Sequence, residues 1–173
     1  LYELSGTIKS KEALQQPSPT SGIRMGEGAT FFVLSDTFGE ETLAELVDVT
    51  FCNQLENNSI EHFTHTFLSR EGLELSDIDL IVSGRNENQD DTSYFENFER
   101  LFPNATTLIY KHLTGEFFTA SAIGTWLGCQ ALQGKEIPKA FFLRKNLDKP
   151  LQYVLLYNQY LGREHSLVLL RKK

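Results

Sequence analysis

Cysteine, methionine and tryptophan are scarce in this sequence of 173 residues, which has two cysteines, one methionine and one tryptophan. Cys52 and Cys129 stand far apart and form no C-x-x-C pair. A disulfide scaffold is therefore excluded, and a reducing, cytoplasmic location is favoured. Proline is also infrequent, at five residues, so most of the chain is free to form helices and strands.

Two kinds of segment are missing altogether. No basic cluster is longer than residues 171–173, and the net charge is −7, which argues against a nucleic-acid partner. No apolar run approaches the roughly 20 residues of a membrane-spanning helix, so no membrane partner is expected either. The remaining composition, 40% hydrophobic and 12% aromatic, is that of a folded domain.

Short apolar runs predict the strands. The run at residues 29–34 is not interrupted by polar residues, which predicts a strand covered on both faces. Six further runs predict strands at residues 45–52, 78–82, 106–110, 140–144, 153–157 and 166–171.

Helical periodicity separates these runs and predicts helices at residues 60–72, 91–102 and 117–133. The alternation indicates an α/β layered architecture with an antiparallel finish. Residues 117–129 have no charge on any side, and such a helix is buried all round. Either it is the central helix of an ordinary domain, or a second sheet outside this chain covers its other side.

Four segments, in order, resemble one family, the β-ketoacyl-carrier-protein synthases. Residues 22–29 resemble its "G-x-x-x-G-E-G-A" segment, and residues 75–82 its strand before the first catalytic histidine. Residues 111–122 resemble "K-S-x-T-G-H-x-x-G-A-A-G", which contains the second histidine, and residues 166–169 resemble the closing strand. The similarity covers most of this chain, but it corresponds to the C-terminal half of a synthase alone.

This resemblance implies the thiolase-like fold, in which two similar halves pack with buried helices between their sheets. The expected half has a mixed five-stranded sheet with a buried central helix, and it spans residues 1–173 as one half-domain. Within it, residues 1–28 form an N-terminal loop region and residues 29–173 the layered core. Because the chain begins with Leu1, we interpret it as lacking the N-terminal half, which in this family holds the nucleophilic cysteine.

The family's two histidines stabilise a developing enolate oxygen by donating hydrogen bonds. Aligning its "H-G-T-G-T-x-x-x-D" motif with residues 83–91 puts Ser83 at the first histidine position. Glu116 occupies the second. A carboxylate there would repel an enolate, unless its pKa were raised by several units. This sequence therefore lacks both of the family's catalytic histidines.

The family lysine is retained as Lys111, while the position of its acidic partner is occupied by Tyr94. We therefore predict a buried ion pair between Lys111 and Glu116. The family's gating loop "F-G-F-G-G" is also degraded, since residues 159–163 keep one glycine. The resemblance thus assigns the family's catalytic positions to Ser83, Lys111 and Glu116. Histidine is lost at two of these positions.

No cofactor or metal site is expected. His62 and His65 lie within one helical turn but have no further ligand at a suitable spacing, so an exposed helix face explains them better. Residues 86–91 lack the glycine and final glutamate of an EF-hand. His112 and His165 are interpreted as structural, although His112 could act as a displaced donor. Cys52 and Cys129 are interpreted as packing residues.

Three interpretations follow. The first is a catalytically degenerate synthase-like subunit, similar to a chain-length factor, which shapes an acyl tunnel beside an active partner. The second is an active condensing acyltransferase whose cysteine lies in the missing half and whose donors are Ser83, His112 or Glu116. The third is a stand-alone α/β interaction module. The first two imply as partners the N-terminal half, a synthase homo- or heterodimer partner and an acyl carrier protein.

Overall fold

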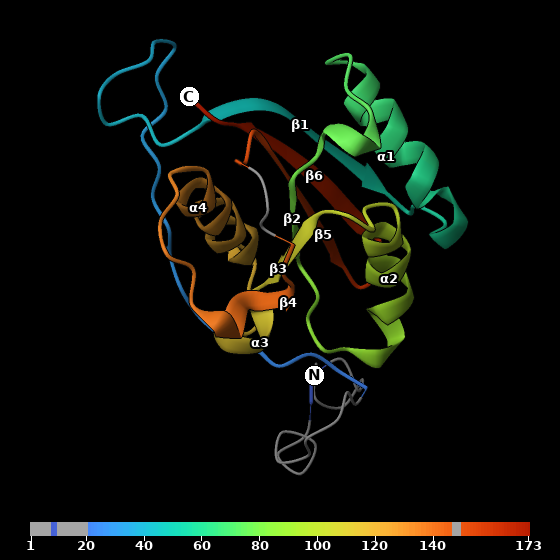
Figure 1. Ribbon diagram of the computed structural model, residues 1–173. Helices are drawn as coiled ribbons and strands as arrows, with labels where there is room; N and C mark the ends of the chain where they lie inside the picture. Colours follow the sequence, from blue (N-terminus) through green and yellow to red (C-terminus); the bar gives the residue numbers. More distant parts are fainter. Residues whose placement is uncertain (1–7, 10–20, 147–149) are drawn as a thin grey trace.

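A mixed six-stranded sheet forms the centre of the protein in the computed structural model, which describes residues 8–9, 21–146 and 150–173 (Figure 1). The strand order is β1-β6-β5-β2-β3-β4. Strand β2 runs parallel to β3 and β5, whereas β6 is antiparallel to β5 and β1, and β4 is antiparallel to β3. The strands are β1 (Glu45–Asn53), β2 (Leu80–Ser83), β3 (Thr106–Ile109), β4 (Phe142–Arg144), β5 (Tyr153–Tyr160) and β6 (Glu164–Arg171).

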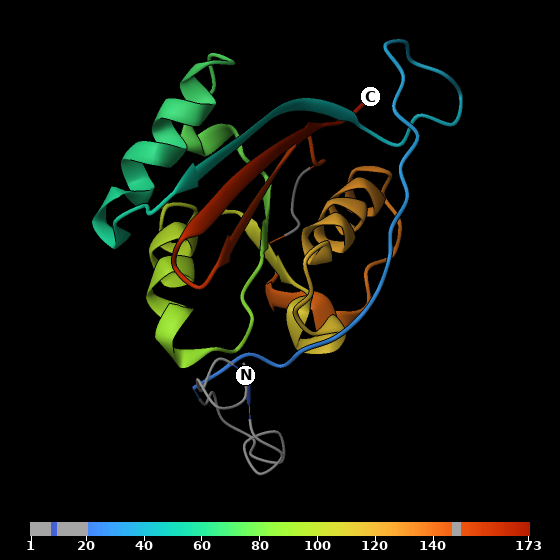
Figure 2. The same cartoon turned by 180° about the vertical axis from the view of Figure 1, so that it is seen from behind.

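Helices lie on both faces of this sheet. Figures 1 and 2 show α1 (Ile60–Ser69) and α2 (Thr92–Arg100) on one side and α4 (Ala120–Leu132) on the other. The short α3 (Lys111–Thr114) follows β3 directly. Single turns of 3-10 helix lie at Asn57–Ser59, Leu75–Asp77, Gln89–Asp91 and Lys139–Phe141. None of the helices formed by the described residues is both long and apolar enough to cross a membrane.

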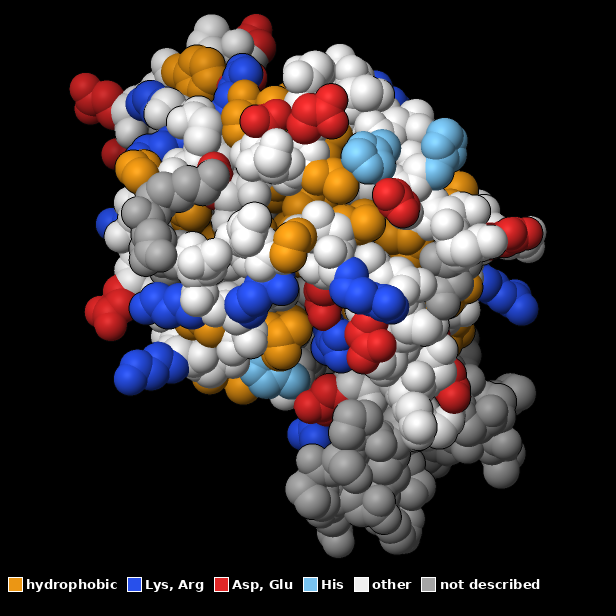
Figure 3. All heavy atoms as spheres, turned by 45° about the vertical axis from the view of Figure 1, so that its right-hand side comes forward, with side chains coloured by type: hydrophobic (Ala, Val, Ile, Leu, Met, Phe, Trp, Pro, Cys, Tyr) orange, Lys and Arg blue, Asp and Glu red, His pale blue; other side chains and the backbone are white. Residues whose placement is uncertain are grey.

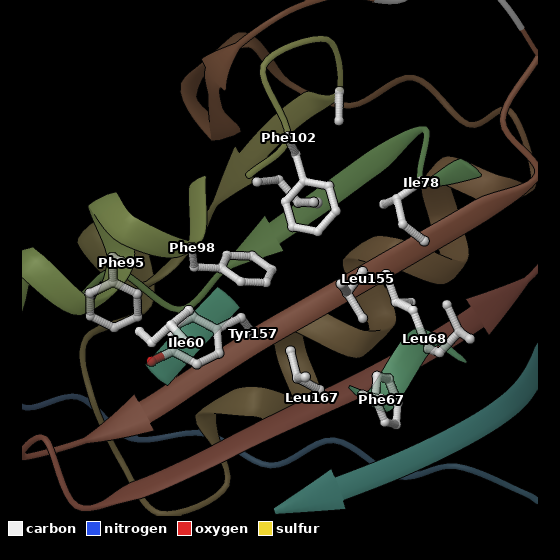
Figure 4. Close-up of a cluster of buried hydrophobic side chains, with 13 residues drawn as sticks. Ile60, Phe67, Leu68, Ile78, Phe95, Phe98, Phe102, Leu155, Tyr157 and Leu167 are labelled. Atoms are coloured by element: carbon white, nitrogen blue, oxygen red, sulfur yellow. The ribbon is translucent and has the colours of Figure 1, made fainter. Parts of the chain in front are cut away.

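The core under α1 and α2 is aromatic. Phe98 stacks on Tyr157 of β5 with ring centroids 4.6 Å apart, and Phe95 meets the same ring edge-on at 5.7 Å. Figure 4 shows these rings beside Leu155 and Leu167 of the central strands. On the outside of these helices, acidic, basic and histidine side chains are interspersed (Figure 3). This side of the sheet is therefore a closed core with a polar surface.

Helix α4 packs on the opposite face through its smallest residues. A side-chain carbon added to Gly124 would lie 2.7 Å from Leu156 and 2.8 Å from the Tyr110 ring. At Gly128 the corresponding distances are 3.0 Å to Leu170 and 3.1 Å to Val154. The glycines therefore let the helix backbone approach the sheet closely. Away from the sheet, Trp126 stays 43% exposed, so the described residues cover only one side of this uncharged helix.

The predicted strand at residues 29–34 is wrong for this structure. The segment is extended but belongs to no strand, and Phe31 and Val33 are 93% and 99% exposed. Figures 1 and 2 show it in blue, running along the outer side of α4 and away from the sheet edges. A strand needs a neighbouring backbone edge, and none lies beside this segment among the described residues.

The other strand and helix predictions are confirmed with shifted ends, and the sheet has six strands where five were expected. Strands β5 and β6 extend further into their hairpin than predicted, while the predicted helix at residues 117–133 begins only at Ala120. Of the predicted N-terminal loop region, residues 1–7 and 10–20 lie outside the described residues. Residues 21–28 form a strap across the ends of the strands, described below as part of the site.

Candidate functional site

A buried ion pair joins Lys111 and Glu116, as predicted. Lys111 opens α3 directly after β3, and its Nζ lies 2.6 Å from Glu116 Oε2 and 2.6 Å from Asn158 Oδ1. Lys111 and Glu116 are only 2% and 3% exposed. Two oppositely charged groups removed from water in this way stabilise each other, and loss of either one leaves the other uncompensated.

The backbone around Glu116 explains how the pair is positioned. Gly115 has a φ of 72°, a conformation that suits glycine and ends α3 with a sharp change of direction. Glu116 then bonds to the strap, because its N–H donates to Arg24 O at 2.8 Å and its carbonyl accepts from Gly26 N–H at 2.9 Å. A side-chain carbon on Gly26 would lie 2.0 Å from Thr114 O, so the two glycines permit this close crossing.

An asparagine network extends the pair. Asn86 Nδ2 donates to Glu116 Oε2 at 3.3 Å, and Asn86 Oδ1 accepts from the Asn88 N–H. Asn88 in turn donates to Asp91 Oδ2 at 2.9 Å and accepts from the Gly22 N–H. Asn86, Asn88 and Asp91 are all buried. The loop after β2 is thus connected to both the ion pair and the strap by side-chain hydrogen bonds.

The electrostatics of the pair oppose its use as an oxyanion-stabilising site. Burial lowers the pKa of Lys111, and attraction to Glu116 works against that shift. The Lys111 ammonium is already shared between Glu116 and Asn158, and its side chain is fully enclosed. Catalysis of this kind needs preorganised donors that point at the developing negative charge. Here the group that lines the neighbouring cavity is the acceptor Glu116, whereas the Lys111 cation is enclosed and does not line it.

A cavity of about 320 Å³ lies against the pair, at the open end of the sheet beside α4. Glu116 and Asn158 form its polar wall, and Phe51, Phe117 and Phe118 form an aromatic one. Its remaining lining residues are Asn53, Ser121, Tyr160, Glu164, His165 and Ser166. A pocket that combines aromatic side chains with several polar groups is suited to a small organic ligand that has both apolar and polar parts.

Ser83, the third predicted site residue, is separated from this cavity. It pairs in register with Tyr157, so its side chain lies on the face of the sheet that carries α2. There its hydroxyl donates to Glu99 Oε1 at 2.8 Å, and Arg85 Nη2 binds the same carboxylate at 2.7 Å. The structure therefore brings Lys111 and Glu116 together and leaves Ser83 on the other face.

Neither the half-buried His112 nor the buried His165 forms a hydrogen bond to the ion pair. His112 Nε2 bonds to Ala140 O at 2.8 Å and lines a separate cavity of about 720 Å³ with Arg85 and Ile109. His165 is 1% exposed, and its Nδ1 bonds to the Tyr157 hydroxyl at 2.9 Å. The described residues contain no group of three or more His, Cys, Asp or Glu side chains that could hold a metal ion.

The two cysteines behave as packing residues in this fold. Cys129 is 6% exposed in the core between α4 and the sheet, and burial raises the pKa of its thiol. A raised pKa disfavours the nucleophilic thiolate. Cys52 lies near the end of β1 as a free, half-buried thiol.

Two residues that hydrogen-bond to the ion pair were not predicted from the sequence. Asn158 is 47 residues from Lys111 and Asn86 is 30 residues from Glu116. A signal was present for Asn158, since it and Gln159 follow the apolar run of β5 within the same strand, and buried polar residues require partners. Asn86 lies in a polar loop in which nothing distinguishes it from its neighbours.

The sequence matches no model of a known protein family and no curated protein. Solved structures match the fold. A β-ketoacyl synthase from Burkholderia phymatum STM815 matches over 99% of this chain and 50% of its own, with a TM-score of 0.69 and 14% identity. The AntDE:AntF type II polyketide acyl-carrier protein in complex with its ketosynthase matches over 76% of this chain and 39% of its own, with a TM-score of 0.61 and 14% identity.

The ishigamide ketosynthase/chain length factor matches over 76% of this chain and 38% of its own, with a TM-score of 0.59 and 16% identity. The chain therefore has the fold of one part of the thiolase-like ketosynthases and chain length factors, as the resemblance implied. It spans half or less of the length of these three structures.

Proposed function

We propose that this chain is a β-ketoacyl synthase-like component of cytoplasmic fatty acid or polyketide-type biosynthesis. In this proposal it is a catalytically degenerate partner subunit that helps to shape an acyl tunnel, while another polypeptide or segment supplies the nucleophile. The fold shared with ketosynthases and chain length factors supports the general role. The ion pair supports the degenerate character.

The observation that carries the proposal is the buried pair at the wall of the cavity. A carboxylate, Glu116, accepts from Lys111 and Asn86 where the resemblance places a histidine donor. Ser83, at the other histidine position, donates to Glu99 on the opposite face. With these groups bound to one another, neither position of the resemblance offers a free donor to an oxyanion, while the three phenylalanines of the cavity are suited to contact an acyl chain.

The partners we propose are the complementary half of the fold, a synthase subunit and an acyl carrier protein. This chain covers 50% of the matched Burkholderia structure, so the other half of that structure has no counterpart here. The AntDE:AntF complex combines a ketosynthase with its acyl-carrier protein. Exposed apolar side chains around α4, such as Trp126 and Phe118, offer a surface for the complementary half.

A second candidate is an active condensing acyltransferase whose cysteine lies outside this chain. The observation that favours it is the position of Glu116 and Asn158 in the wall of the cavity, within reach of a bound molecule. Such an enzyme would need Glu116, in its protonated form, to donate to a developing oxyanion. It would therefore lose condensing activity when Glu116 is replaced.

Filling the cavity tests the acyl-tunnel role. Ser121 lines the cavity on α4, and Ser121→Phe would place a ring in its apolar part. In the natively assembled complex we expect shorter acyl products at a similar total rate, as measured by mass spectrometry of the products. Ser69→Phe, at the exposed end of α1, is the matched control and should leave product length unchanged. Unchanged product length with Ser121→Phe would contradict the proposal.

A further inference from the structure

Three neighbouring strands form the floor of the cavity beside the ion pair. Asn158 of β5 pairs in register with Ser166 of β6, and Ser166 pairs with Phe51 of β1. The next row along the same three strands consists of Tyr160, Glu164 and Asn53. Alternate residues of a strand point to the same face, so these six side chains lie together on the face that carries α4. All six line the cavity.

The charges around this cavity have one sign. Glu116 and Glu164 are its acidic lining residues, and the described residues that line it include no lysine or arginine. His165 alternates with the residues of the floor, and its side chain bonds to Tyr157 on the opposite face, so it adds no charge to the cavity. The lining therefore attracts a positively charged group and repels a carboxylate.

Both carboxylates have an oxygen that is available to a ligand. The hydrogen bonds from Lys111 and Asn86 both reach Glu116 at Oε2, and no other described side chain donates to its Oε1. Glu164 is exposed and forms no ion pair or side-chain hydrogen bond with the rest of the described chain. A protonated amine in the cavity would supply the counter-ion of Glu164 and a charge-assisted hydrogen bond to Glu116 Oε1.

Aromatic rings make the site suitable for an organic cation. Phe118 and Tyr160 lie with ring centroids 6.4 Å apart, and Phe51 and Phe117 add two further rings to the lining. The face of an aromatic ring attracts an ammonium group, and the same rings can contact an apolar chain. A metal ion needs more ligands, and the described residues contain no group of three or more His, Cys, Asp or Glu side chains that could hold one.

We propose that this cavity binds the protonated amino group of an amine-bearing acyl chain. The inference rests on the proposed function, since it names the class of acyl chain that the tunnel accepts. The ammonium group donates hydrogen bonds to Glu164 and to Glu116 Oε1, while the rings contact the carbon chain next to it. An acyl chain that ends in a methyl group or a carboxylate lacks these charge-assisted hydrogen bonds and binds more weakly.

Three probes of equal chain length test this selectivity. Hexylamine, hexanol and hexanoate differ only in the polar end, and isothermal titration of the natively purified protein at neutral pH measures their dissociation constants. We expect hexylamine to bind about tenfold more tightly than hexanol, and hexanoate to bind most weakly. Equal affinity for hexylamine and hexanol, or no binding of either, would overturn the inference. Shorter products with Ser121→Phe would then still support the proposed function, whereas unchanged products would overturn both.

A neutral variant tests whether the amine is bound in the cavity. Glu164→Gln removes the carboxylate but keeps the size of an exposed side chain, so the melting temperature should not change. We expect the affinity for hexylamine to fall about tenfold, while the affinity for hexanol stays the same. Glu136→Gln, at an exposed position after α4, changes the net charge equally and should bind hexylamine normally.

Two results of this comparison would contradict the proposed amine site. Unchanged hexylamine binding by Glu164→Gln would show that its carboxylate does not contact the amine. An equal loss of affinity in Glu164→Gln and Glu136→Gln would show that hexylamine responds to the overall negative charge of the protein. Either result would overturn the inference and leave the acyl-tunnel role to be decided by the products of Ser121→Phe.

Discussion

The two faces of the sheet differ in how completely they are covered. On the face of α1 and α2, Phe95 and Phe98 close over Tyr157, and a polar surface lies outside them. On the face of α4, a single helix packs through glycines, and apolar side chains such as Trp126 remain exposed around it. The first face is a completed core. The second has the character of an interface, and the ion pair and cavity lie at its edge.

Phenylalanine truncations on the two faces should therefore differ most. Phe98→Ala removes a fully buried ring and should lower the free energy of unfolding by about 3–5 kcal/mol. Phe118→Ala, at a 94% exposed position on the open face, should change it by about 0.5 kcal/mol or less. Urea unfolding followed by circular dichroism measures both. Equal losses would mean that the α4 face is as tightly packed as the other.

Breaking the ion pair should have the next largest effect. Lys111→Met leaves Glu116 buried without its cation, which should cost about 3 kcal/mol, at the low end for buried pairs because Asn86 still donates to the carboxylate. Chemical denaturation measures the loss. Lys135→Met, at an exposed lysine after α4, is the control. If Lys111→Met were no more destabilising than this control, the pair would contribute nothing to folding.

Removing both charges distinguishes the stabilisation that the ion pair contributes from the cost of leaving one buried charge unpaired. The double variant Lys111→Met with Glu116→Leu removes both charges of the pair, so it should recover most of the stability that Lys111→Met loses. A double variant as unstable as the single one would indicate that the charges are required individually.

The effect of pH should be the smallest. Burial lowers the pKa of His165, outweighing the opposing influence of the Gly162 carbonyl and Asp91. In the unfolded chain this histidine binds a proton near pH 6.5, whereas in the folded chain it stays neutral to lower pH. The free energy of unfolding is therefore unaffected by His165 above that pH and decreases as the pH falls below it. One such group contributes at most about 1.4 kcal/mol per pH unit.

His165→Gln should flatten this dependence between pH 6.5 and 5, as followed by urea midpoints across the range. His62→Gln, at an exposed position on α1, should not. A wild-type slope in His165→Gln would exclude His165 as the titrating group.

The sequence was sufficient to predict the helices and strands that pack against other parts of this same chain. The strands of the central sheet and the amphipathic α1 and α2 follow from local periodicity, and six of the seven predicted strands are present. The ion pair was also predicted, because the retained Lys111 loses its family partner at Tyr94 and gains a carboxylate at Glu116, five residues away. Local pattern and short separation are what sequence reasoning can use.

The failures have a common physical origin in distant contacts. Asn158 and Asn86 reach the pair across 47 and 30 residues, a separation that no local pattern encodes. The strand at residues 29–34 was predicted from a pattern that is typical of covered strands, but the described residues contain no edge to pair with it. In that case the pattern describes an environment that this chain does not provide.

The intact mass of the native assembly tests most directly whether this chain is a degenerate partner, as we propose. The natively expressed protein would be incubated with an acyl carrier protein thioester, and the mass of each polypeptide recorded before and after. We predict that the polypeptide containing this sequence keeps its mass, while a copurifying synthase gains the acyl group. An acyl mass gained by the polypeptide containing this sequence would contradict the claim and identify an active enzyme.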